Sequence, residues 1–314
     1  MLPKVVTVTL NPALDKTIII PRLDVGGLNR VEQMRLDPGG KGVNVAKVLK
    51  KFAIDVIATG FIGNSQGGVI QKSLKDLGIK TEFVEVQGVT RTNLKIVDNQ
   101  TKLTTEINEP GFEVSAEDLT KFREKLSNLL QDASFLILGG SLPRGVPEDI
   151  YKDYITLAKG KNVKSILDAD GKALKEGIKA RPFAVKPNIH ELEQLVGRSL
   201  PTEQDIVTAG QELIHEGVTV VVVSMGSKGS IVLDKKEAYR VTPFPITPQS
   251  TVGAGDSMVA AMTYAFLENK LLEEVARWAT AAGTVTASKA GTEVCSFAEV
   301  QRLLNDVNVT RIQL

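Results

Sequence analysis

Cysteine and histidine are scarce in this chain of 314 residues, which contains one cysteine and two histidines. The single cysteine, Cys295, excludes an internal disulfide and is typical of a protein in a reducing compartment, so we expect a cytoplasmic location. The same scarcity argues against a zinc site, because zinc ions in proteins are held mainly by cysteine and histidine side chains.

A long apolar run and an excess of charge of either sign are also missing. The longest apolar run is 218–223, and one threonine interrupts it, whereas a membrane span needs about 20 residues. The N-terminal segment lacks a small-residue cleavage site and predicts a strand rather than a signal peptide. Lysine and arginine total 38 against 37 acidic residues, so the net charge does not favour nucleic acid or an anionic membrane as a partner.

Short runs of valine, isoleucine and leucine recur along the chain and alternate with amphipathic stretches. The runs are apolar at almost every position, as strands are when both faces of a parallel sheet are covered. We predict strands at 4–10, 55–63, 134–141, 163–170, 182–188 and 218–226 and helices at 42–52, 69–78, 115–132 and 203–217. This order is typical of a doubly wound α/β fold, in which helices flank a mostly parallel sheet.

Two segments, 12–36 and 88–108, interrupt this pattern with turn residues and with strands whose polar and apolar side chains alternate. The second segment predicts a β-hairpin. Alternation indicates one exposed face, so we expect the two segments to form a small β-sheet, inserted into the main domain as a lid. The main α/β domain, which would bind nucleotide and substrate, then comprises 1–11, 37–87 and 109–314.

A glycine-rich turn near the C-terminal end carries the first candidate for chemistry. In STVGAGDSMVAA, Gly253, Ala254 and Gly255 precede Asp256 and an apolar helix. Small residues let a ligand approach the backbone, and the first turn of a helix offers unpaired N–H groups to an anion. The helix dipole should favour the ionised form of Asp256, which could then accept a proton during phosphoryl transfer to a hydroxyl. A helix cap packed tightly against the sheet is the alternative interpretation.

PGGKGVNVAK, residues 38–47, is a second glycine-rich loop that precedes a helix. It sets Lys41 and Asn44 among glycines, where they can bind sugar hydroxyls or an anion; a tight turn with a surface lysine is the alternative. Asp15 follows the first strand, at the edge where ligands bind in open α/β sheets, and its carboxylate can accept bonds from two vicinal hydroxyls. Taken alone, Asp15 fits an ordinary turn equally well.

Asn188 and Glu191 follow a predicted strand with the spacing of one helical turn. Their oxygens can hold a hydrated Mg²⁺ ion and its phosphates, and the same spacing also fits a helix cap. In the turn at 224–230, Gly226 and Gly229 leave room for a nucleotide or simply turn a hairpin. No P-loop motif occurs, and GAGDSM lacks the third glycine of a dinucleotide-binding fingerprint.

Together these segments resemble the ribokinase-like sugar kinases of the phosphofructokinase B branch over nearly the whole chain. Both signatures of that family are visible, in PGGKGVNVAKVL and STVGAGDSMVAAM, with GGSLPRGVP and VKPNIHEL between them. The resemblance implies transfer of phosphate from ATP, with Mg²⁺, to a ketohexose monophosphate. TLNPALD, GGLNRV, TRTNLKI and GFEVSAEDL are most similar to members that act on fructose 1-phosphate, and near relatives act on tagatose 6-phosphate.

The resemblance also implies roles for individual residues. Asp256 would be the catalytic base, and the amides of Gly253, Ala254 and Gly255 would form the anion hole. Sugar-phosphate-binding roles are implied for Asp15, Arg30, Gly39, Gly40, Lys41, Asn44, Arg91 and Ser141. ATP-binding roles are implied for Lys186, Asn188, Ser224, Gly226, Gly229 and Gly255, and metal binding, through water, for Asn188 and Glu191.

The family pattern further suggests a homodimer in which two lids pair, which would cover the exposed lid edge. Two positions depart from that pattern. Asp170 stands where relatives often have serine, and Arg144 stands where many have a neutral residue or lysine. Arg144 bears on phosphate recognition, so fructose 1-phosphate and tagatose 6-phosphate both stay open as substrates. A non-catalytic sugar-phosphate-binding protein is a remote alternative, because the base and its glycines are present.

Overall fold

A ten-stranded sheet forms the centre of the computed structural model, which describes residues 4–314 apart from the side chain of Ser65. Its strands are β1 (Lys4–Thr9), β4 (Asp55–Gly63), β5 (Lys80–Val86), β8 (Ala133–Gly139), β9 (Lys164–Asp168), β10 (Ala184–Val185), β11 (Val220–Ser224), β12 (Ser230–Leu233), β13 (Ala238–Thr242) and β14 (Asn308–Ile312). The order is β14-β13-β12-β11-β10-β9-β8-β1-β4-β5. Pairs from β11 to β5 are parallel, and those from β11 to β14 are antiparallel.

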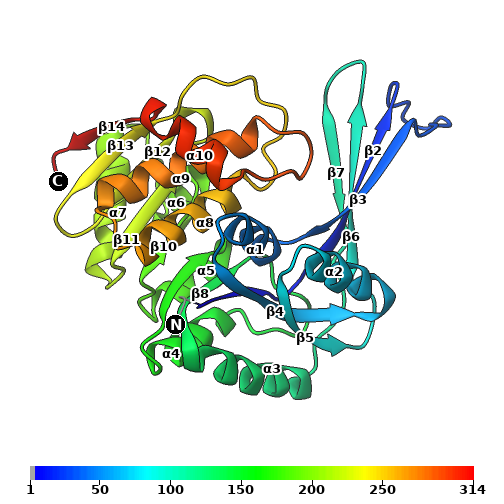
Figure 1. The fold of residues 1–314 in the computed structure, drawn as a ribbon, viewed down its shortest axis with the longest axis horizontal. Coiled ribbons are helices and arrows are strands. Elements are labelled where there is room, and N and C mark those ends of the chain that lie inside the picture. Colours follow the sequence, from blue (N-terminus) through cyan, green and yellow to red (C-terminus); the bar gives the residue numbers. More distant parts are fainter. Residues whose placement is uncertain (1–3) are drawn as a thin grey trace.

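Helices cover both faces of this sheet (Figure 1). They are α1 (Lys41–Lys51), α2 (Asn64–Asp76), α3 (Ala116–Leu129), α4 (Ile150–Lys159), α5 (Gly171–Ile178), α6 (Ile189–Val196), α7 (Glu203–His215), α8 (Ala254–Leu267), α9 (Leu272–Ala287) and α10 (Phe297–Leu303). Alternate strand residues bury against α1, α2, α8 and α9 on one side and against α3 to α7 on the other. The doubly wound, mostly parallel α/β prediction is therefore confirmed.

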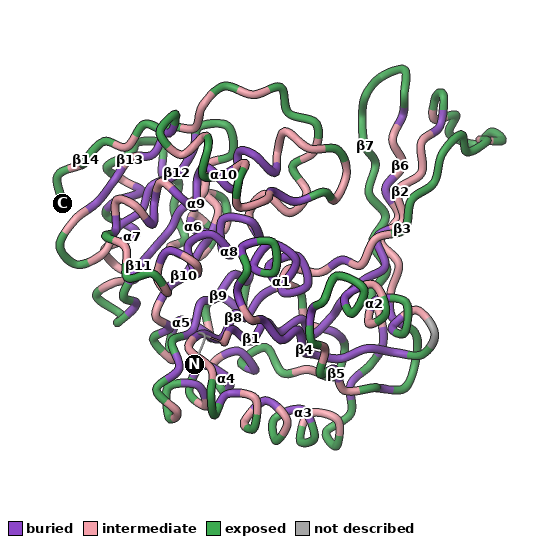
Figure 2. Tube along the Cα trace, viewed as in Figure 1, coloured by how far each residue is buried: buried purple, intermediate pink, exposed green. Residues whose placement is uncertain are grey.

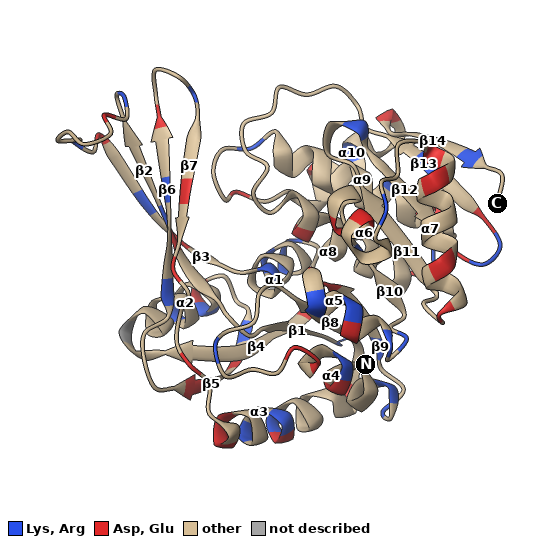
Figure 3. Cartoon of the chain, turned by 180° about the vertical axis from the view of Figure 1, so that it is seen from behind, with Lys and Arg blue, Asp and Glu red and all other residues tan. Residues whose placement is uncertain are grey.

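The core follows the central strands and the helix faces turned toward them, whereas the outer helix faces are exposed (Figure 2). Acidic and basic residues are spread over the helices and the small sheet (Figure 3). Within residues 4–314, no helix combines the length and the apolarity that a membrane span needs.

Several predicted elements have different bounds in the structure. The strand predicted at 182–188 is reduced to β10, and α2 begins five residues before the prediction of 69–78. The first residues of α2 are polar or glycine, so they carry no helical apolar period that sequence reasoning could detect.

A second, four-stranded sheet stands away from the main domain (Figure 1). It consists of β3 (Gln33–Gly39), β2 (Ala13–Ile20), β6 (Arg91–Asp98) and β7 (Thr104–Asn108), in that order. The predicted hairpin is present as β6 and β7, while β2 and β6 pair in parallel. The small sheet of the prediction is confirmed, and its strand β3 continues to Gly39, past the expected boundary at residue 36.

The two faces of the small sheet differ in polarity because side chains alternate along each strand. One face carries the cross-strand rows Leu36, Lys16, Leu94, Ile107 and Met34, Ile18, Ile96, Thr105. The opposite face carries the rows Asp37, Asp15, Asn93, Asn108 and Arg35, Thr17, Lys95, Glu106. The first face is mainly apolar yet partly exposed, with Met34 at 58% and Ile107 at 54% exposure.

Candidate active site

Asp256 lies in the first turn of α8, and its side chain is buried, with 7% of the residue exposed. The turn before it requires glycine at 253, where φ is 75° and the backbone is left-handed. The amides of Gly255 and Asp256 have no hydrogen-bond acceptor within residues 4–314, so they can bind an anion. The amide of Ala254 instead donates to the carbonyl of Thr251 at 3.3 Å.

The carboxyl group of Asp256 holds its proton more tightly than an ordinary aspartate. Burial and the nearby negative charge of Asp168 raise the pKa of Asp256 to about 6, against the opposing hydrogen bond from Asn44. That bond runs from Asn44 Nδ2 to Asp256 Oδ2 at 2.8 Å. The helix dipole was expected to favour the ionised form of Asp256, whereas burial and the second carboxylate favour the protonated form.

Two lysines flank Asp256 and share one buried carboxylate. Asp168, at the carboxyl end of β9, is 3% exposed and lies 2.8 Å from Lys41 Nζ and 3.4 Å from Lys186 Nζ. Burial alone would raise the pKa of Asp168. The positive charges of the two lysines lower this pKa by more than burial raises it, so the carboxyl group stays ionised. Burial lowers the pKa of Lys41, and the attraction of Asp168 reverses the shift to a raised value. The result is a pair of cations held in place beside Asp256.

Lys186 reaches the first turn of α8 directly. A methyl group at Gly255 would lie 3.3 Å from Lys186 Nζ, so position 255 keeps room between the helix and this ammonium group. Sequence reasoning identified Lys41 and Lys186 but not Asp168. The signal was present, since Asp168 ends an apolar strand at the edge where Asp15 was found.

Asp15 on β2 belongs to a second buried polar group, on the charged face of the small sheet. Its carboxylate accepts a hydrogen bond from Asn93 Nδ2 at 3.0 Å and lies 3.3 Å from Lys95 Nζ. A Cβ atom at Gly39 would lie 2.6 Å from Asp15 Oδ2, so a larger residue there would displace the Asp15 carboxylate. Asn93 and Lys95 were missed by sequence reasoning, because alternation in a hairpin does not show which strand lies opposite.

Arg91, the first residue of β6, lies beside Ser141, and the family resemblance implied a phosphate-binding role for both. Its guanidinium donates to Ser141 Oγ at 3.2 Å and to the carbonyl of Asn11 at 3.1 Å. Burial lowers the pKa of Arg91. Arg30 is exposed in the connection between β2 and β3, and its side chain has no hydrogen bond or ion pair within the described chain. The structure therefore groups Arg91 with Ser141 but leaves Arg30 outside.

The two positions that depart from the family pattern are both exposed. Arg144 uses its carbonyl to accept the amide of Val114 at 2.9 Å. Asp170 occupies the N-cap position of α5 without a side-chain capping bond. Neither side chain is among the groups around Asp256.

Asn188 and Glu191 form a reciprocal capping box at the start of α6, so the capping interpretation describes their local structure. Asn188 Oδ1 accepts the Glu191 amide at 2.9 Å, and Glu191 Oε2 accepts the Asn188 amide at 2.7 Å. Glu191 Oε1 has no hydrogen-bond partner among the described residues and can accept one from a metal-bound water. Residues 4–314 contain no cluster of three His, Cys, Asp or Glu arranged to hold a metal ion.

The turn after β11 combines an open glycine with a packed one. A methyl group at Gly226, where φ is 58°, would meet nothing within 4 Å. At Gly229 it would lie 2.0 Å from the carbonyl of Val241, so this glycine is required by the hairpin into β12. Ser224 ends β11 and bridges to Asn188, which brings the two candidate ATP-binding turns together.

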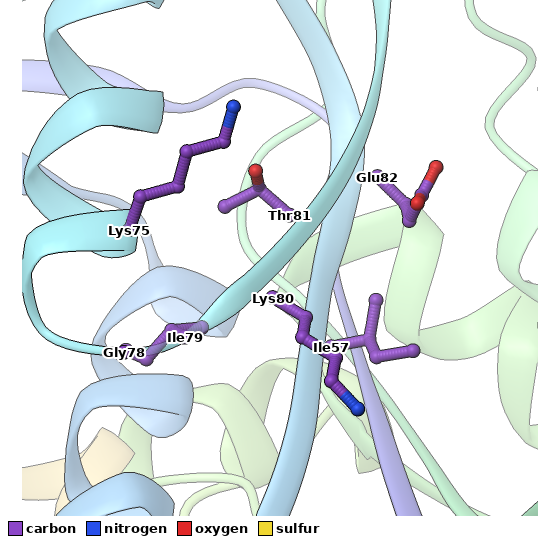
Figure 4. A pocket seen from close by; sticks show the side chains of 7 residues that line it. All are labelled: Ile57, Lys75, Gly78, Ile79, Lys80, Thr81 and Glu82. Carbon is purple, nitrogen blue, oxygen red and sulfur yellow. The ribbon is translucent and has the colours of Figure 1, made fainter.

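A separate hollow lies away from these groups. It has a volume of about 360 Å³ and lies between α2 and the edge strand β5 (Figure 4). The polar ends of Lys75, Lys80 and Glu82 point in different directions rather than toward a common point (Figure 4). None of its lining residues belongs to the groups around Asp256 or Asp15, so we assign the active site to those groups.

Comparison with known proteins agrees with this geometry. The pfkB family carbohydrate kinase model matches residues 8–298. The 1-phosphofructokinase of Vibrio cholerae is 35% identical over 312 residues, which cover 99% of this chain and 98% of the relative. The 1-phosphofructokinase of Borreliella burgdorferi is 36% identical over 307 residues, covering 98% of each chain.

Solved structures of Escherichia coli phosphofructokinase-2 have the same fold. The complex with potassium has a TM-score of 0.92 at 32% identity, over 98% of this chain and 99% of that chain. The complex with fructose-6-phosphate has a TM-score of 0.90 at 31% identity, with the same two coverages.

Proposed function

The chain belongs to the pfkB family of carbohydrate kinases, and we propose that it transfers the γ-phosphoryl group of ATP to fructose 1-phosphate, giving fructose 1,6-bisphosphate and ADP. One observation carries the proposal. A buried carboxylate, Asp256, stands beside two unpaired amides at a helix N-terminus, with Lys41 and Lys186 fixed next to it. In-line phosphoryl transfer needs such positioned charges more than it needs covalent chemistry.

Asp256 accepts the proton of the acceptor hydroxyl. As the hydroxyl oxygen bonds to the γ-phosphorus, the bond from that phosphorus to the β–γ bridging oxygen breaks, and ADP leaves. With a pKa of about 6, Asp256 is mostly ionised at pH 7 and is still more basic than an ordinary aspartate. The amides of Gly255 and Asp256 and the two lysines stabilise the negative charge on the moving group.

The remaining polar groups divide between the sugar phosphate and ATP. In this proposal Arg91 and Ser141 bind the phosphate that the sugar already carries. Asp15, Asn44 and the loop at Gly40 bind the hydroxyl groups of the sugar. The proposed ATP side comprises Lys186, Asn188, Ser224 and Gly226, which lie at the ends of neighbouring strands. Mg²⁺ would neutralise phosphate charge, and Glu191 would hold it through water.

We further propose that the small sheet is a lid and that two lids pair in a homodimer. The apolar face with Met34 and Ile107 supports this, because a partly exposed sheet face of this kind gains stability when a second copy covers it. Closing of the lid over the sugar would exclude water, which competes as an acceptor. A cytoplasmic location fits Cys295, which is buried as a free thiol.

A coupled ADP-release assay with fructose 1-phosphate, tagatose 6-phosphate and fructose 6-phosphate tests the proposal. We expect the highest kcat/KM for fructose 1-phosphate. A preference for either other sugar would overturn the substrate assignment. Absence of ADP release with all three, in a folded protein supplied with Mg²⁺, would overturn the kinase assignment itself.

A further inference from the structure

Lys47, on α1, is a buried lysine to which the proposed reaction assigns no role. Only 9% of the residue is exposed, and lysine is rarely buried to this degree without partners. It lies one helical turn after Asn44, in the second glycine-rich signature. Its Nζ donates to the carbonyl of Pro38, the penultimate residue of β3, and lies 3.4 Å from Asn44 Oδ1.

The contact with Lys47 determines which end of the Asn44 amide faces Asp256. A lysine nitrogen in its ammonium form can only donate, so it selects the oxygen end of the amide. The nitrogen end is thereby left for Asp256, to which Asn44 Nδ2 donates at 2.8 Å. An ionised Asp256 favours the same orientation, but without Lys47 the amide could rotate by half a turn when the carboxyl is protonated, and its oxygen would then accept the carboxyl proton.

We propose that Lys47 is a positioning residue for the reaction: it orients Asn44 so that the Asn44 amide hydrogen-bonds Asp256 and aims it at the acceptor hydroxyl. This inference rests on the proposed function of Asp256 as the base. Because Lys47 also bonds to Pro38, the same contact connects the end of β3 to the site. This chain of contacts runs from the carbonyl of Pro38 through the side chains of Lys47 and Asn44 to that of Asp256, and so connects the small sheet, α1 and α8.

The charged groups around Lys47 and Asp256 determine how this chain of contacts responds to pH. Lys47 is faced by Asp37 and Arg35 from β3, by Asp15 from β2 and by Asp256 from α8. Asp256 is faced by Asp168 from β9, by Lys41 from α1 and by Lys186, which follows β10. Burial lowers the pKa of Lys47 to about 8, against the attraction of these carboxylates, so Lys47 is charged over the pH range in which Asp256 ionises.

The test compares Lys47→Met with Lys51→Met, a matched control on the same helix. Lys51 also donates to a backbone carbonyl, that of Val294 at 2.9 Å, but has no bond to Asn44 or Asp256. In Lys47→Met we expect kcat to fall by about tenfold or more and KM for ATP to stay within about twofold. An amide oxygen turned toward Asp256 favours the protonated carboxyl, so the acid limb of kcat/KM should move to higher pH.

Lys51→Met should keep the acid limb of the wild-type protein, and Lys47→Arg, which retains donors, should recover part of the lost kcat. If Lys47→Met does not fold, Lys47→Leu, which also lacks a donor, replaces it with the same expected displacement of the acid limb. An acid limb identical to the wild type in the folded Lys47 variant would reduce Lys47 to a structural residue and overturn the inference. Failure of the proposed function would look different, because Asp256→Asn would then retain its kcat.

Discussion

The charged groups of the main domain and those of the small sheet are organised in different ways. In the main domain, Asp256, Asp168 and two lysines gather from four separate segments and are held by buried ion pairs. In the small sheet, the charges around Asp15 occupy one face, while the opposite face is apolar and partly exposed. The first region is buried within the main domain, and the second presents a mainly apolar face that is partly exposed.

This difference indicates a division of labour. Groups that must be fixed for phosphoryl transfer lie at the ends of packed strands and helices, where neighbours limit their motion. The groups that we propose to enclose the sugar lie on the small sheet, which stands away from the main domain, as expected of an element that would move during the reaction. Substitutions in the two regions should therefore have different consequences, which can be measured separately.

The largest effect is expected at Asp256. Asp256→Asn removes the proton acceptor and should lower kcat by about 10³-fold, with little change in the binding of ATP. Steady-state kinetics with fructose 1-phosphate measure this. Asp170→Asn is the control, since Asp170 is an exposed aspartate on α5, and its kcat should match the wild type. Equal losses of kcat in the two variants would contradict the role of Asp256 as the base.

Asp168 should determine the stability of the main domain more than any exposed ion pair does. Asp168→Asn leaves the buried Lys186 and the partly exposed Lys41 without their counter-charge, which should cost about 3–5 kcal/mol in the free energy of unfolding. Urea denaturation measures this. Glu117→Gln breaks the exposed pair with Lys121 and should leave the free energy of unfolding close to that of the wild type. A similar small change in both variants would mean that the buried cluster is not structural.

The apolar face of the small sheet should determine assembly rather than folding. Ile107→Glu puts a charge into the proposed lid-to-lid contact and should weaken the dimer by about 2 kcal/mol, measured by sedimentation at several concentrations. Leu271→Glu is the matched control, because Leu271 is an apolar residue of the main domain with 77% exposure. Its sedimentation should be that of the wild type. A wild-type protein that is monomeric at working concentration would contradict the homodimer.

The two regions also differ in how far the sequence predicts them. Continuous apolar runs identified the parallel strands β1, β4, β8, β9, β10 and β11, since both of their faces are buried, but not the edge strand β5, in which polar residues alternate with apolar ones. Among the short antiparallel strands, β12 is apolar but only four residues long, whereas β13 and β14 mix polar and apolar residues, and the three were not predicted as a group. The small sheet was found through alternation and turn residues, but its partners across the strands were not.

Within the site, glycine-rich loops identified Asp256, Lys41 and Asn44. A ligand can approach the backbone closely only where the residues are small, and such stretches are recognisable in the sequence. Their partnerships could not be predicted. Lys41 and Asp168 are 127 residues apart, and Asn44 and Asp256 are 212 residues apart. Such groups meet only because of the order of the strands in the sheet, and a local sequence pattern does not reveal that order. Lys47 was missed for the same reason, since its function depends on Pro38 and on the orientation of a neighbouring amide.

The smallest effect, and the finest test of the comparison, is the pH dependence of stability at Asp256 and at Asp98 of the small sheet. The pKa of Asp256 is raised to about 6, so the folded protein binds this proton more tightly than the unfolded chain does. Stability is therefore lost as pH rises toward 6. The side chain introduced by Asp256→Asn cannot ionise. The free energy of unfolding of this variant should therefore exceed that of the wild type by on the order of 2 kcal/mol at pH 7.5, but not at pH 4.

Asp98 should show the opposite sign. Its carboxylate accepts the amides of Leu23, Gln100 and Thr101, and these bonds lower its pKa. Its contribution is present above the pKa of the unfolded chain and is lost as pH falls, so Asp98→Asn should be less stable than the wild type at pH 7.5 and approach it in acid. Urea titrations of both variants at the two pH values measure this. Parallel pH trends would show that the two regions do not differ in how they hold their carboxylates.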